Sequence, residues 1–299
     1  MASLDRRLPG NVPGALFVDS TCIDCDTCRL LDPAVYRAEG GQSVVHAQPA
    51  GVAAWERACK ALVSCPTASI GVRAPAGAEG DALREGLARA RAAFPDPVDA
   101  EVAFCGWTSA ESYGAWSWLL RRPGGNVLVD SPRFSEPLAR AIEAQGGARW
   151  MFLTHRDDVA DHARWAARLG AERVMHADDA GAGERAMERL LTGDAPVRLA
   201  DDLLVIPTPG HTRGHAVLLH ADRHLFTGDH LAWDSGEQRL VAFRSVCWYD
   251  WGRQTDSMVR LLDYTFRWVL PGHGERVELA PDLMRTRVME CIDRMSMVK

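Results

Sequence analysis

Three cysteines at two-residue gaps, in the stretch CIDCDTC, constrain this chain more than any other feature of its sequence. Three thiolates on one tight loop can hold three corners of an iron–sulfur cube, and the fourth corner then needs a cysteine from a distant segment. Cys65, followed directly by Pro66, is such a cysteine. We therefore expect one [4Fe-4S] cluster, ligated by Cys22, Cys25, Cys28 and Cys65.

This arrangement resembles a bacterial ferredoxin, in which a C-x2-C-x2-C run and a remote Cys-Pro supply the ligands. Two-cluster ferredoxins add a further cysteine at the position that Asp32 occupies here, and the matching positions before Cys65 also lack cysteine. A single cluster follows. A four-cysteine zinc knuckle is the alternative, but it pairs two C-x2-C halves and fits the spacing poorly. The resemblance covers roughly residues 14–73.

The composition of the whole chain narrows the class of protein. With 299 residues, 47% of them hydrophobic, the chain can bury a large core. The net charge is −6 and the sequence has no basic stripe, so we do not expect the protein to bind nucleic acid. No run long enough to cross a membrane and no secretory signal is visible, so we expect a cytoplasmic protein with no membrane partner. The sequence does not predict an oligomeric state.

The cysteines and the linker-like segment after them divide the chain. Five of the eight cysteines precede residue 66. The stretch RAPAGAEGDALREG mixes Ala, Gly and charge without a strand pattern and reads as a linker that runs into a helix. We predict a ferredoxin-like domain over residues 1–75, a linker over 76–95 and a second domain over 96–299. In that second domain short apolar runs alternate with amphipathic helices, which predicts an α/β fold.

Histidine and aspartate gather where the apolar runs of the second domain end. TPGHTRGH offers His211 and His215, FTGDH offers Asp229 and His230, and LPGHG offers His273. An earlier run, RWMFL, leads into THRDDVADH. These side chains are the preferred ligands of zinc, iron or manganese. One such turn is most often a polar loop, but several in succession predict a metal centre.

These turns resemble the motifs of the metallo-β-lactamase superfamily, whose first motif is H-x-H-x-D-H. The resemblance implies an αββα sandwich of two sheets flanked by helices, over about residues 100–280, with the metal site along one edge. The TPGHTRGH turn is similar to that of glyoxalase II enzymes. The resemblance implies His215 and His230 as partners of the ligands. The implied metal ligands are His155, Asp161, His162, His211, Asp229 and His273, with Asp161 and Asp229 at the catalytic centre.

The first motif departs from the family pattern, because its second histidine is absent and the stretch is two residues longer. If the strand end fixes the register, Asp157 takes the place of that histidine. If the helix start fixes it, Asp157 and Val159 occupy the two histidine positions, and one metal site is depleted. We favour the first register. One metal would then take His155, Asp157 and His211, another would take Asp161, His162 and His273, and Asp229 would bridge them. Replacing histidine by aspartate favours iron or manganese over zinc.

Three functions are compatible with these features. The first is a hydrolase that uses a metal-activated water on a small ester, thioester or lactone, with the cluster as an electron-transfer or redox-control module. The second is an iron-dependent oxidoreductase fed by the cluster, since the superfamily's flavodiiron proteins also carry a carboxylate at the position of Asp157. The third is a redox or iron sensor without catalysis. A small-molecule substrate and a redox partner protein are the expected partners.

Overall fold

A computed structural model of the protein describes residues 1–73 and 75–297. The chain forms two compact units that alternate along the sequence. The first contains Met1–Arg121 and Pro132–Gly147, and the second contains Arg122–Ser131 and the chain from Ala148 onwards. The border between the units therefore does not coincide with the predicted linker at residues 76–95. That residues 76–95 divide the ferredoxin-like domain from the second domain remains a prediction. No helix in the described part of the chain is long and apolar enough to span a bilayer.

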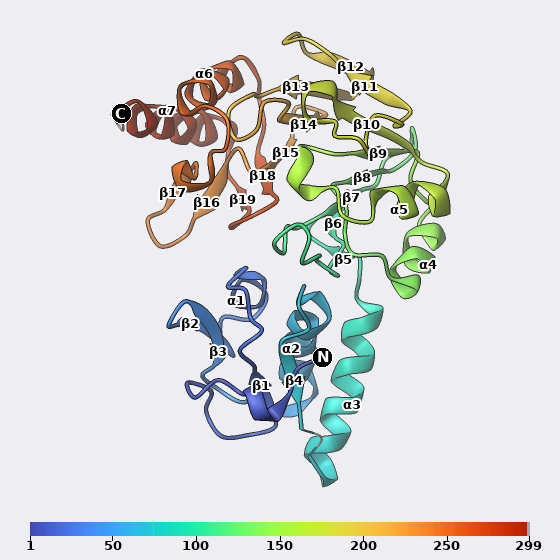
Figure 1. The fold of residues 1–299 in the computed structure, drawn as a ribbon, viewed down its shortest axis with the longest axis vertical. Helices are drawn as coiled ribbons and strands as arrows, with labels where there is room; N and C mark the ends of the chain where they lie inside the picture. Colours follow the sequence, from blue (N-terminus) through green and yellow to red (C-terminus); the bar gives the residue numbers. More distant parts are fainter. Residues whose placement is uncertain (74, 298–299) are drawn as a thin grey trace. The chain divides into compact units, whose positions relative to one another are not determined.

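The first 72 residues form a small α+β arrangement (Figure 1). A short turn η1 (Leu4–Arg6) precedes strand β1 (Leu16–Val18), which pairs antiparallel with β4 (Ile70–Val72). Between them lie α1 (Thr27–Leu31), the hairpin β2 (Tyr36–Glu39) and β3 (Gln42–Val45), and α2 (Gly51–Ser64). Buried Leu16, Tyr36 and Trp55 lie in one apolar core.

The segment predicted as a linker is mostly helical. Helix α3 (Gly77–Ala92) is rich in Ala, Leu, Arg and Glu, which are strong helix formers. Leu83 and Ala90 are buried in the same core as Trp55. A Cβ atom at Gly86 would lie 2.7 Å from Cβ of Trp55, so the two helices α2 and α3 approach closely here. The helix is thus an integral part of the first unit.

The rest of the first unit contains three antiparallel strands and a helix: β5 (Asp96–Pro97), β6 (Val102–Phe104), β7 (Trp118–Leu120) and α4 (Glu136–Ala144). The apolar run EVAFCGW contains β6, and the stretch SEPLARAIEAQGG has the punctuation of a helix, with Ser135 before α4 and Pro137 in its first turn. Ser135 does occupy the N-cap position, but its side chain makes no capping hydrogen bond. Strand β7 was not predicted.

The second unit holds a parallel run of strands, β8 (Val127–Val129), β9 (Trp150–Phe152), β10 (Glu172–His176) and β11 (Arg189–Leu191). Strands β8 and β9 are fully buried, which explains their continuous apolar sequences. After β9 come the turn η2 (Arg156–Asp158) and helix α5 (His162–Leu169). The helix ends at Gly170, which adopts a left-handed conformation.

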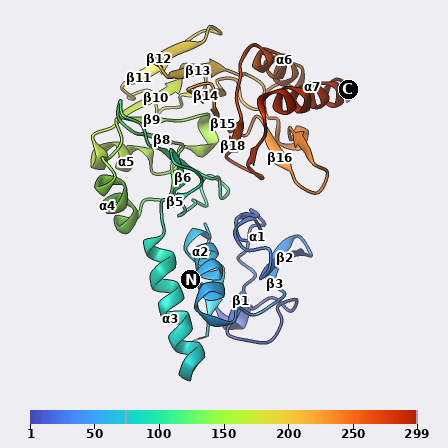
Figure 2. The ribbon, with the colours of Figure 1, turned by 180° about the vertical axis from the view of Figure 1, so that it is seen from behind.

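A second sheet has the order β12-β13-β14-β15-β18-β19. Its strands are β12 (Val197–Ala200), β13 (Leu203–Pro207), β14 (Ala216–His220), β15 (His224–Gly228), β18 (Trp268–Pro271) and β19 (Val277–Glu278). Helices α6 (Trp251–Arg260) and α7 (Pro281–Met297) cover one face, where Met258 and Val288 pack with Val217 and Leu225 (Figure 2). A hairpin of β16 (Ala232–Asp234) and β17 (Arg239–Val241) joins the same core.

The two sheets of the second unit are tied together near the ends of their strands. The backbone N–H of Ala216, at the start of β14, donates to the carbonyl of Thr154, just after β9. This layered arrangement of helices and sheets is the predicted αββα sandwich, here preceded by a small ferredoxin-like fold. It brings the turns after β9, β13, β15 and β18 to a common edge.

Candidate metal centre and iron–sulfur site

Four ligand atoms meet where these turns converge: His155 and Asp157 follow β9, His211 follows β13, and Asp229 follows β15. Nε2 of His211 lies 3.5 Å from Oδ2 of Asp157 and 3.7 Å from Oδ2 of Asp229. Nε2 of His155 lies 3.9 Å and 3.7 Å from the same two oxygens. The sequence predicted all four residues, and the structure brings them together.

These separations suit a four-coordinate metal ion. Metal–nitrogen and metal–oxygen bonds of about 2.0–2.2 Å in a tetrahedral site place the ligand atoms roughly 3.3–3.6 Å apart. The four distances lie close to this range. His155, Asp157 and His211 converge as one group of possible ligands, and His155, Asp158 and Asp229 converge as another. Moreover, Nε2 of His155 and both ring nitrogens of His211 are buried and have no hydrogen-bond partner among the described residues. Buried imidazoles without partners are costly unless another group binds them, so the site fits a metal.

A buried carboxylate orients His155. Oδ1 of Asp130 accepts hydrogen bonds from the backbone N–H of Thr154 at 2.8 Å and from its hydroxyl at 2.9 Å. The same hydroxyl lies 3.0 Å from Nδ1 of His155. This contact leaves Nε2 directed at the metal position. Burial raises the pKa of Asp130 to about 7 and lowers the pKa of His155 to about 4.

His273 contacts both oxygens of the Asp229 carboxylate. Its Nδ1 is 2.8 Å from Oδ1 and 3.0 Å from Oδ2 of that carboxylate. Burial by itself would raise the pKa of Asp229, but His273, His155 and His211 together outweigh it and lower the pKa. Asp229 is therefore held as an anion, ready to bind a cation.

The predicted second ligand set does not assemble. His162 lies with Nε2 3.7 Å from Glu184 and Nδ1 3.4 Å from Arg173. Asp161 is the N-cap residue of α5, and its carbonyl accepts from Arg164 and Trp165. Among the described residues, neither joins a group of converging ligand atoms. The physical reason is the turn η2, which takes up the two extra residues and starts α5 away from the four-ligand site.

Asp158, by contrast, lies close to His155 and Asp229. Its side chain is buried, and neither oxygen has a hydrogen-bond partner in the described chain. Oδ2 lies 4.0 Å from Nδ1 of His155. Burial, reinforced by Asp229 and Asp130, raises the pKa of Asp158 well above its usual value. Because Nδ1 of His155 already contacts Thr154, His155 does not have a free nitrogen for a second ion beside Asp158.

Asp179, in the turn η3 (Ala177–Asp179), is a positioning residue that sequence reasoning missed. Its carboxylate accepts hydrogen bonds from the backbone N–H of Arg156, the hydroxyl of Thr212 and the backbone N–H of Gly214. One buried side chain thus joins the loop of Asp157 to the loop of His211. An aspartate following a strand was a visible signal, but its partners lie far away in sequence.

His215 and His230, expected as partners of the ligands, extend the cluster of imidazoles. Their rings lie 5.6 Å apart, and the ring of His215 lies 5.2 Å from that of His155. Nδ1 of His215 is 2.9 Å from the hydroxyl of Thr208. Burial lowers the pKa of His230 to about 3 and that of His215 well below its usual value. Both rings are therefore neutral and pack behind the metal ligands.

In the first unit, Cys22, Cys25, Cys28 and Cys65 line one small cavity. The backbone N–H of Ser43 points to Sγ of Cys22 at 3.4 Å, and that of Ser69 points to Sγ of Cys65 at 3.3 Å. Such contacts stabilise cluster sulfurs. Burial raises the pKa of Cys25 to about 11 and of Cys28 to about 12, so their thiolates need a bound cation. The cavity therefore fits the predicted cluster.

The loop between β6 and β7 contacts the segments on both sides of this cavity. The hydroxyl of Tyr113 donates to the carbonyl of Ile23, and the hydroxyl of Thr27 donates to the carbonyl of Gly114 at 3.3 Å. On the other side, the hydroxyl of Thr108 donates to the carbonyl of Ser64 at 2.6 Å, next to Cys65. The cysteine loops are thus anchored by a segment that lies outside the ferredoxin-like motif.

Residues 18–72 match the family described as the 4Fe-4S single cluster domain of Ferredoxin I. This segment precedes the αββα sandwich that carries the candidate metal ligands. The chain therefore joins a segment similar to a single-cluster iron–sulfur domain to an αββα sandwich.

Curated relatives carry the description hydroxyacylglutathione hydrolase. The chain is 34% identical to that of Acidiphilium cryptum over 119 residues, which are 39% of this chain and 49% of the relative. It is 35% identical to that of Xanthomonas axonopodis over 127 residues, 38% and 45% of the two chains. The chain thus spans about half the length of the curated relatives it matches. Among solved structures, ETHE1 from Myxococcus xanthus is 21% identical, with 64% of this chain and 89% of that chain covered and a TM-score of 0.46.

Proposed function

We propose that the second module is a metal-dependent hydrolase acting on a small thioester. The observation that carries this proposal is the convergence of His155, Asp157, His211 and Asp229 at separations that suit one metal ion. The similarity to hydroxyacylglutathione hydrolases supports the substrate class. A divalent ion held there polarises a carbonyl group and supplies a nucleophile from water near neutral pH.

The chain's own residues prepare the site for this chemistry. His155 is neutral at physiological pH, because its pKa is lowered to about 4 by burial, and Asp229 is ionised beside His273. Trp248 and Tyr249 are exposed aromatic residues whose backbone N–H groups donate to the carbonyl of His211 at 2.8 Å and 3.1 Å. They therefore flank the metal position and offer an apolar surface to a substrate.

For the metal itself we propose one ion, with iron or manganese preferred over zinc. Two of the four ligands are carboxylates, and hard oxygen ligands favour those ions. The set of Asp161, His162 and His273 proposed for a second ion lacks two of its members at the site. His273 contacts Asp229 instead.

In the first module we propose that Cys22, Cys25, Cys28 and Cys65 bind the [4Fe-4S] cluster. The cluster would exchange electrons with a redox partner protein or control the hydrolase. Cytoplasmic reducing conditions would keep the cysteines available. Cys59 is buried in the apolar core of α2 and does not line the cavity, so it serves as a control. Cys65→Ser should lose the visible absorbance of the cluster, and Cys59→Ser should keep it.

One observation favours a second candidate function, an iron-dependent oxidoreductase. A site with two carboxylates and two imidazoles is a common environment for iron, and an iron–sulfur module in the same chain is a source of electrons. This candidate predicts oxygen consumption by protein whose cluster has been reduced, and no release of thiol from a thioester.

The test is thiol release from a hydroxyacylglutathione thioester by anaerobically purified holoprotein. We expect turnover that is lost in His211→Ala, is removed by a chelator and returns with added metal. His46→Ala, at a half-buried histidine of the first module, should leave turnover unchanged. Metal-loaded protein that releases no thiol would contradict the hydrolase. Oxygen consumption that requires His211 would then support the oxidoreductase.

A further inference from the structure

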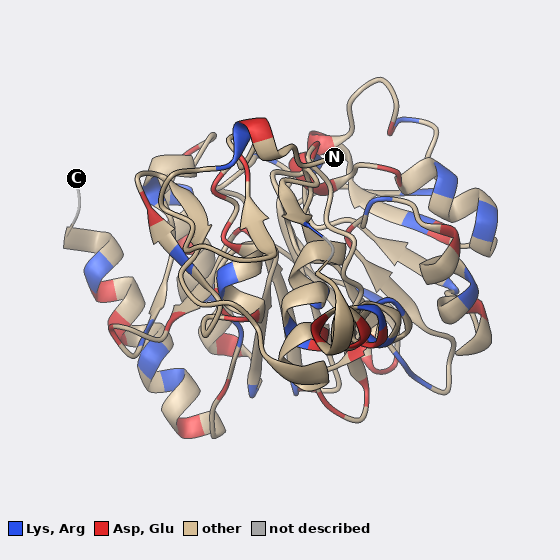
Figure 3. Ribbon diagram, turned by 90° about the horizontal axis from the view of Figure 1, so that it is seen from below, with Lys and Arg blue, Asp and Glu red and all other residues tan. Residues whose placement is uncertain are grey.

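A groove in the second unit brings three arginines from separate elements to one place. Arg239 belongs to β17, Arg244 to the turn η4 (Arg244–Val246) and Arg294 to α7. The groove has a volume of about 190 Å³. Its other lining residues are Leu240, Val241, Ala242, Trp251, Cys291 and Met295. Figure 3 shows bands of basic residues along α7, the helix that ends at the C-terminal label.

These three arginines have no carboxylate partner among the residues that the structure describes. Two arginines elsewhere in the chain do have such partners, Arg122 with Asp202 and Arg173 with Glu188 at 2.7 Å. Asp234 lies opposite Arg239 in the β16–β17 hairpin, but its Oδ1 accepts from the backbone N–H of Glu237. Nε of Arg239 is buried without a hydrogen-bond partner in the described chain. Three uncompensated guanidinium groups around one groove favour an anion.

The floor of the groove is apolar and fixed. The indole N–H of Trp251 donates to the carbonyl of Met295 at 3.1 Å, which sets the orientation of its ring. The guanidinium carbon of Arg244 lies 5.9 Å from the centre of that ring. Arg294 donates to the carbonyl of Leu240 at 2.9 Å. Leu240, Cys291 and Met295 are buried at the base. A ligand therefore meets an apolar surface beside the positive charges.

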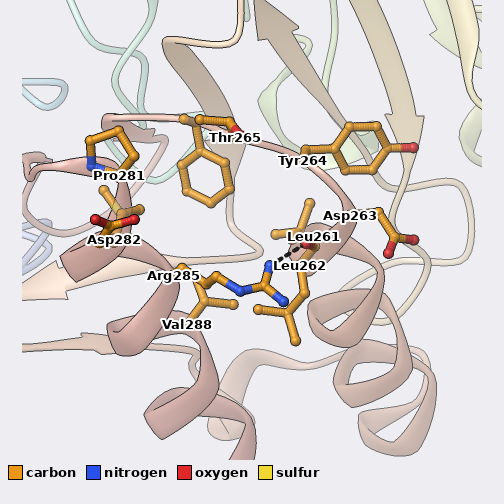
Figure 4. A pocket seen from close by; sticks show the side chains of 11 residues that line it. Leu261, Leu262, Asp263, Tyr264, Thr265, Pro281, Asp282, Arg285 and Val288 are labelled. Carbon is orange, nitrogen blue, oxygen red and sulfur yellow. Dashed lines mark hydrogen bonds between the residues drawn. The ribbon is translucent and has the colours of Figure 1, made fainter.

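A second pocket that also contacts α7 differs from the groove in the charge of its lining residues. Figure 4 shows the pocket between η5 (Leu261–Asp263) and the start of α7. It contains two acidic side chains, Asp263 and Asp282, and its arginine, Arg285, donates to the carbonyl of Leu262 at 2.5 Å. That pocket offers no surplus of positive charge, although both sites contact α7.

We propose that the groove binds a small phosphate monoester with a short apolar body. The phosphate oxygens would accept hydrogen bonds from Arg239, Arg244 and Arg294, since a guanidinium group matches phosphate with paired N–H donors. The apolar body would lie on Trp251 and Met295. A phosphate dianion offers three arginines more acceptor atoms and more negative charge than a carboxylate does. We therefore expect a phosphate monoester to bind more tightly than a carboxylate of the same chain length.

The groove is also connected to the candidate metal centre by a short segment. Trp248 is the fourth residue after Arg244, so their Cα atoms are at most about 14 Å apart. The ring of Trp248 lies 6.4 Å from that of His211. The binding proposal stands on the groove alone and does not depend on hydrolase activity.

The test is calorimetric titration of the full-length holoprotein with hexyl phosphate, hexanoate and inorganic phosphate. Hexyl phosphate should bind tightest. Arg294→Gln and Arg239→Gln should each weaken it about 10-fold or more, as expected for charged hydrogen bonds. Trp251→Leu should weaken hexyl phosphate but not inorganic phosphate. Arg285→Gln, in the neighbouring pocket, is the matched control and should bind as wild type does.

Equal binding of hexanoate and hexyl phosphate would overturn the assignment of the ligand as a phosphate monoester. The site itself would be overturned by wild-type affinity in a folded Arg239→Gln or Arg294→Gln protein, or by an equal loss in Arg285→Gln. If Arg239→Gln and Arg294→Gln do not fold, Arg244→Gln on the exposed rim is tested instead. Weaker binding of hexyl phosphate to this variant would support the site, and wild-type affinity would overturn it.

Discussion

A Cβ atom at Gly114 would lie 2.6 Å from Cβ of Cys25 and 2.9 Å from its Sγ. Gly114 has a φ of +88°, a conformation that side chains with a Cβ rarely adopt. The β6–β7 loop can therefore approach the cysteine loop this closely only because residue 114 is glycine. This relationship links a strand connection in one part of the first unit to the geometry of the cluster ligands.

Gly114→Ala should consequently destabilise the cluster. The added methyl group would push the loop away from Cys25 and open the cluster to solvent. We expect faster loss of visible absorbance on exposure to air. Gly41→Ala is the matched control, because Gly41 also has a positive φ, +76°, but nothing lies within 4 Å of its Cβ position. If both variants lose the cluster at the same rate, backbone strain rather than the contact with Cys25 is responsible.

Asp179→Ala should weaken metal binding about 10-fold to 100-fold, a loss typical for residues that hold ligands in place. The substitution removes the acceptor that joins the loops of Asp157 and His211. Asp178→Ala is the control, since Asp178 is its exposed neighbour and pairs with Arg213. Competitive titration with a chromophoric chelator measures both affinities. Equal affinities in the two variants would show that the loops hold the ligands without Asp179.

The fold and the convergence of the four candidate ligands were predictable because each rests on a local pattern. Apolar runs ending in His or Asp, such as those before His155 and Asp229, show both the strands and the side chains at their ends. The short strands β7, β11 and β12 were missed. The sequence around β7 is crowded with aromatic residues such as Trp116 and Trp118, which are buried but follow no clear alternation.

The part of the predicted site that does not converge in the structure depends on where the two extra residues of the first motif are placed. Asp161 and His162 match the family motif by type, but the turn η2 moves them away from the site and buries Asp158 there. Spacing along the chain does not show which of several aspartates faces inward. The role of Asp179 was equally hidden, because its partners Arg156, Thr212 and Gly214 are distant in sequence from it.

Metal binding should persist at mildly acidic pH. A metal competes with protons for its ligands, and a histidine with a pKa lowered to about 4 stays neutral as the pH falls below its usual value of about 6.5. The pKa values of Asp157 and Asp229 are also lowered, the first chiefly by His211, so both remain ionised. Metal content after equilibrium dialysis should stay high at about pH 5.5 and fall as the pH approaches 4. A midpoint of loss above pH 6 would contradict the role of burial at His155.

The most direct test of the central claim is the number of zinc ions bound per chain after cluster-loaded protein is equilibrated with zinc. Zinc is used because its amount can be measured separately from the iron of the cluster. If one ion lies between His155, Asp157, His211 and Asp229, wild type and His162→Ala should each hold one zinc, and Asp157→Ala should hold far less than one. Two zinc ions in wild type, or loss of zinc in His162→Ala with retention in Asp157→Ala, would contradict the account.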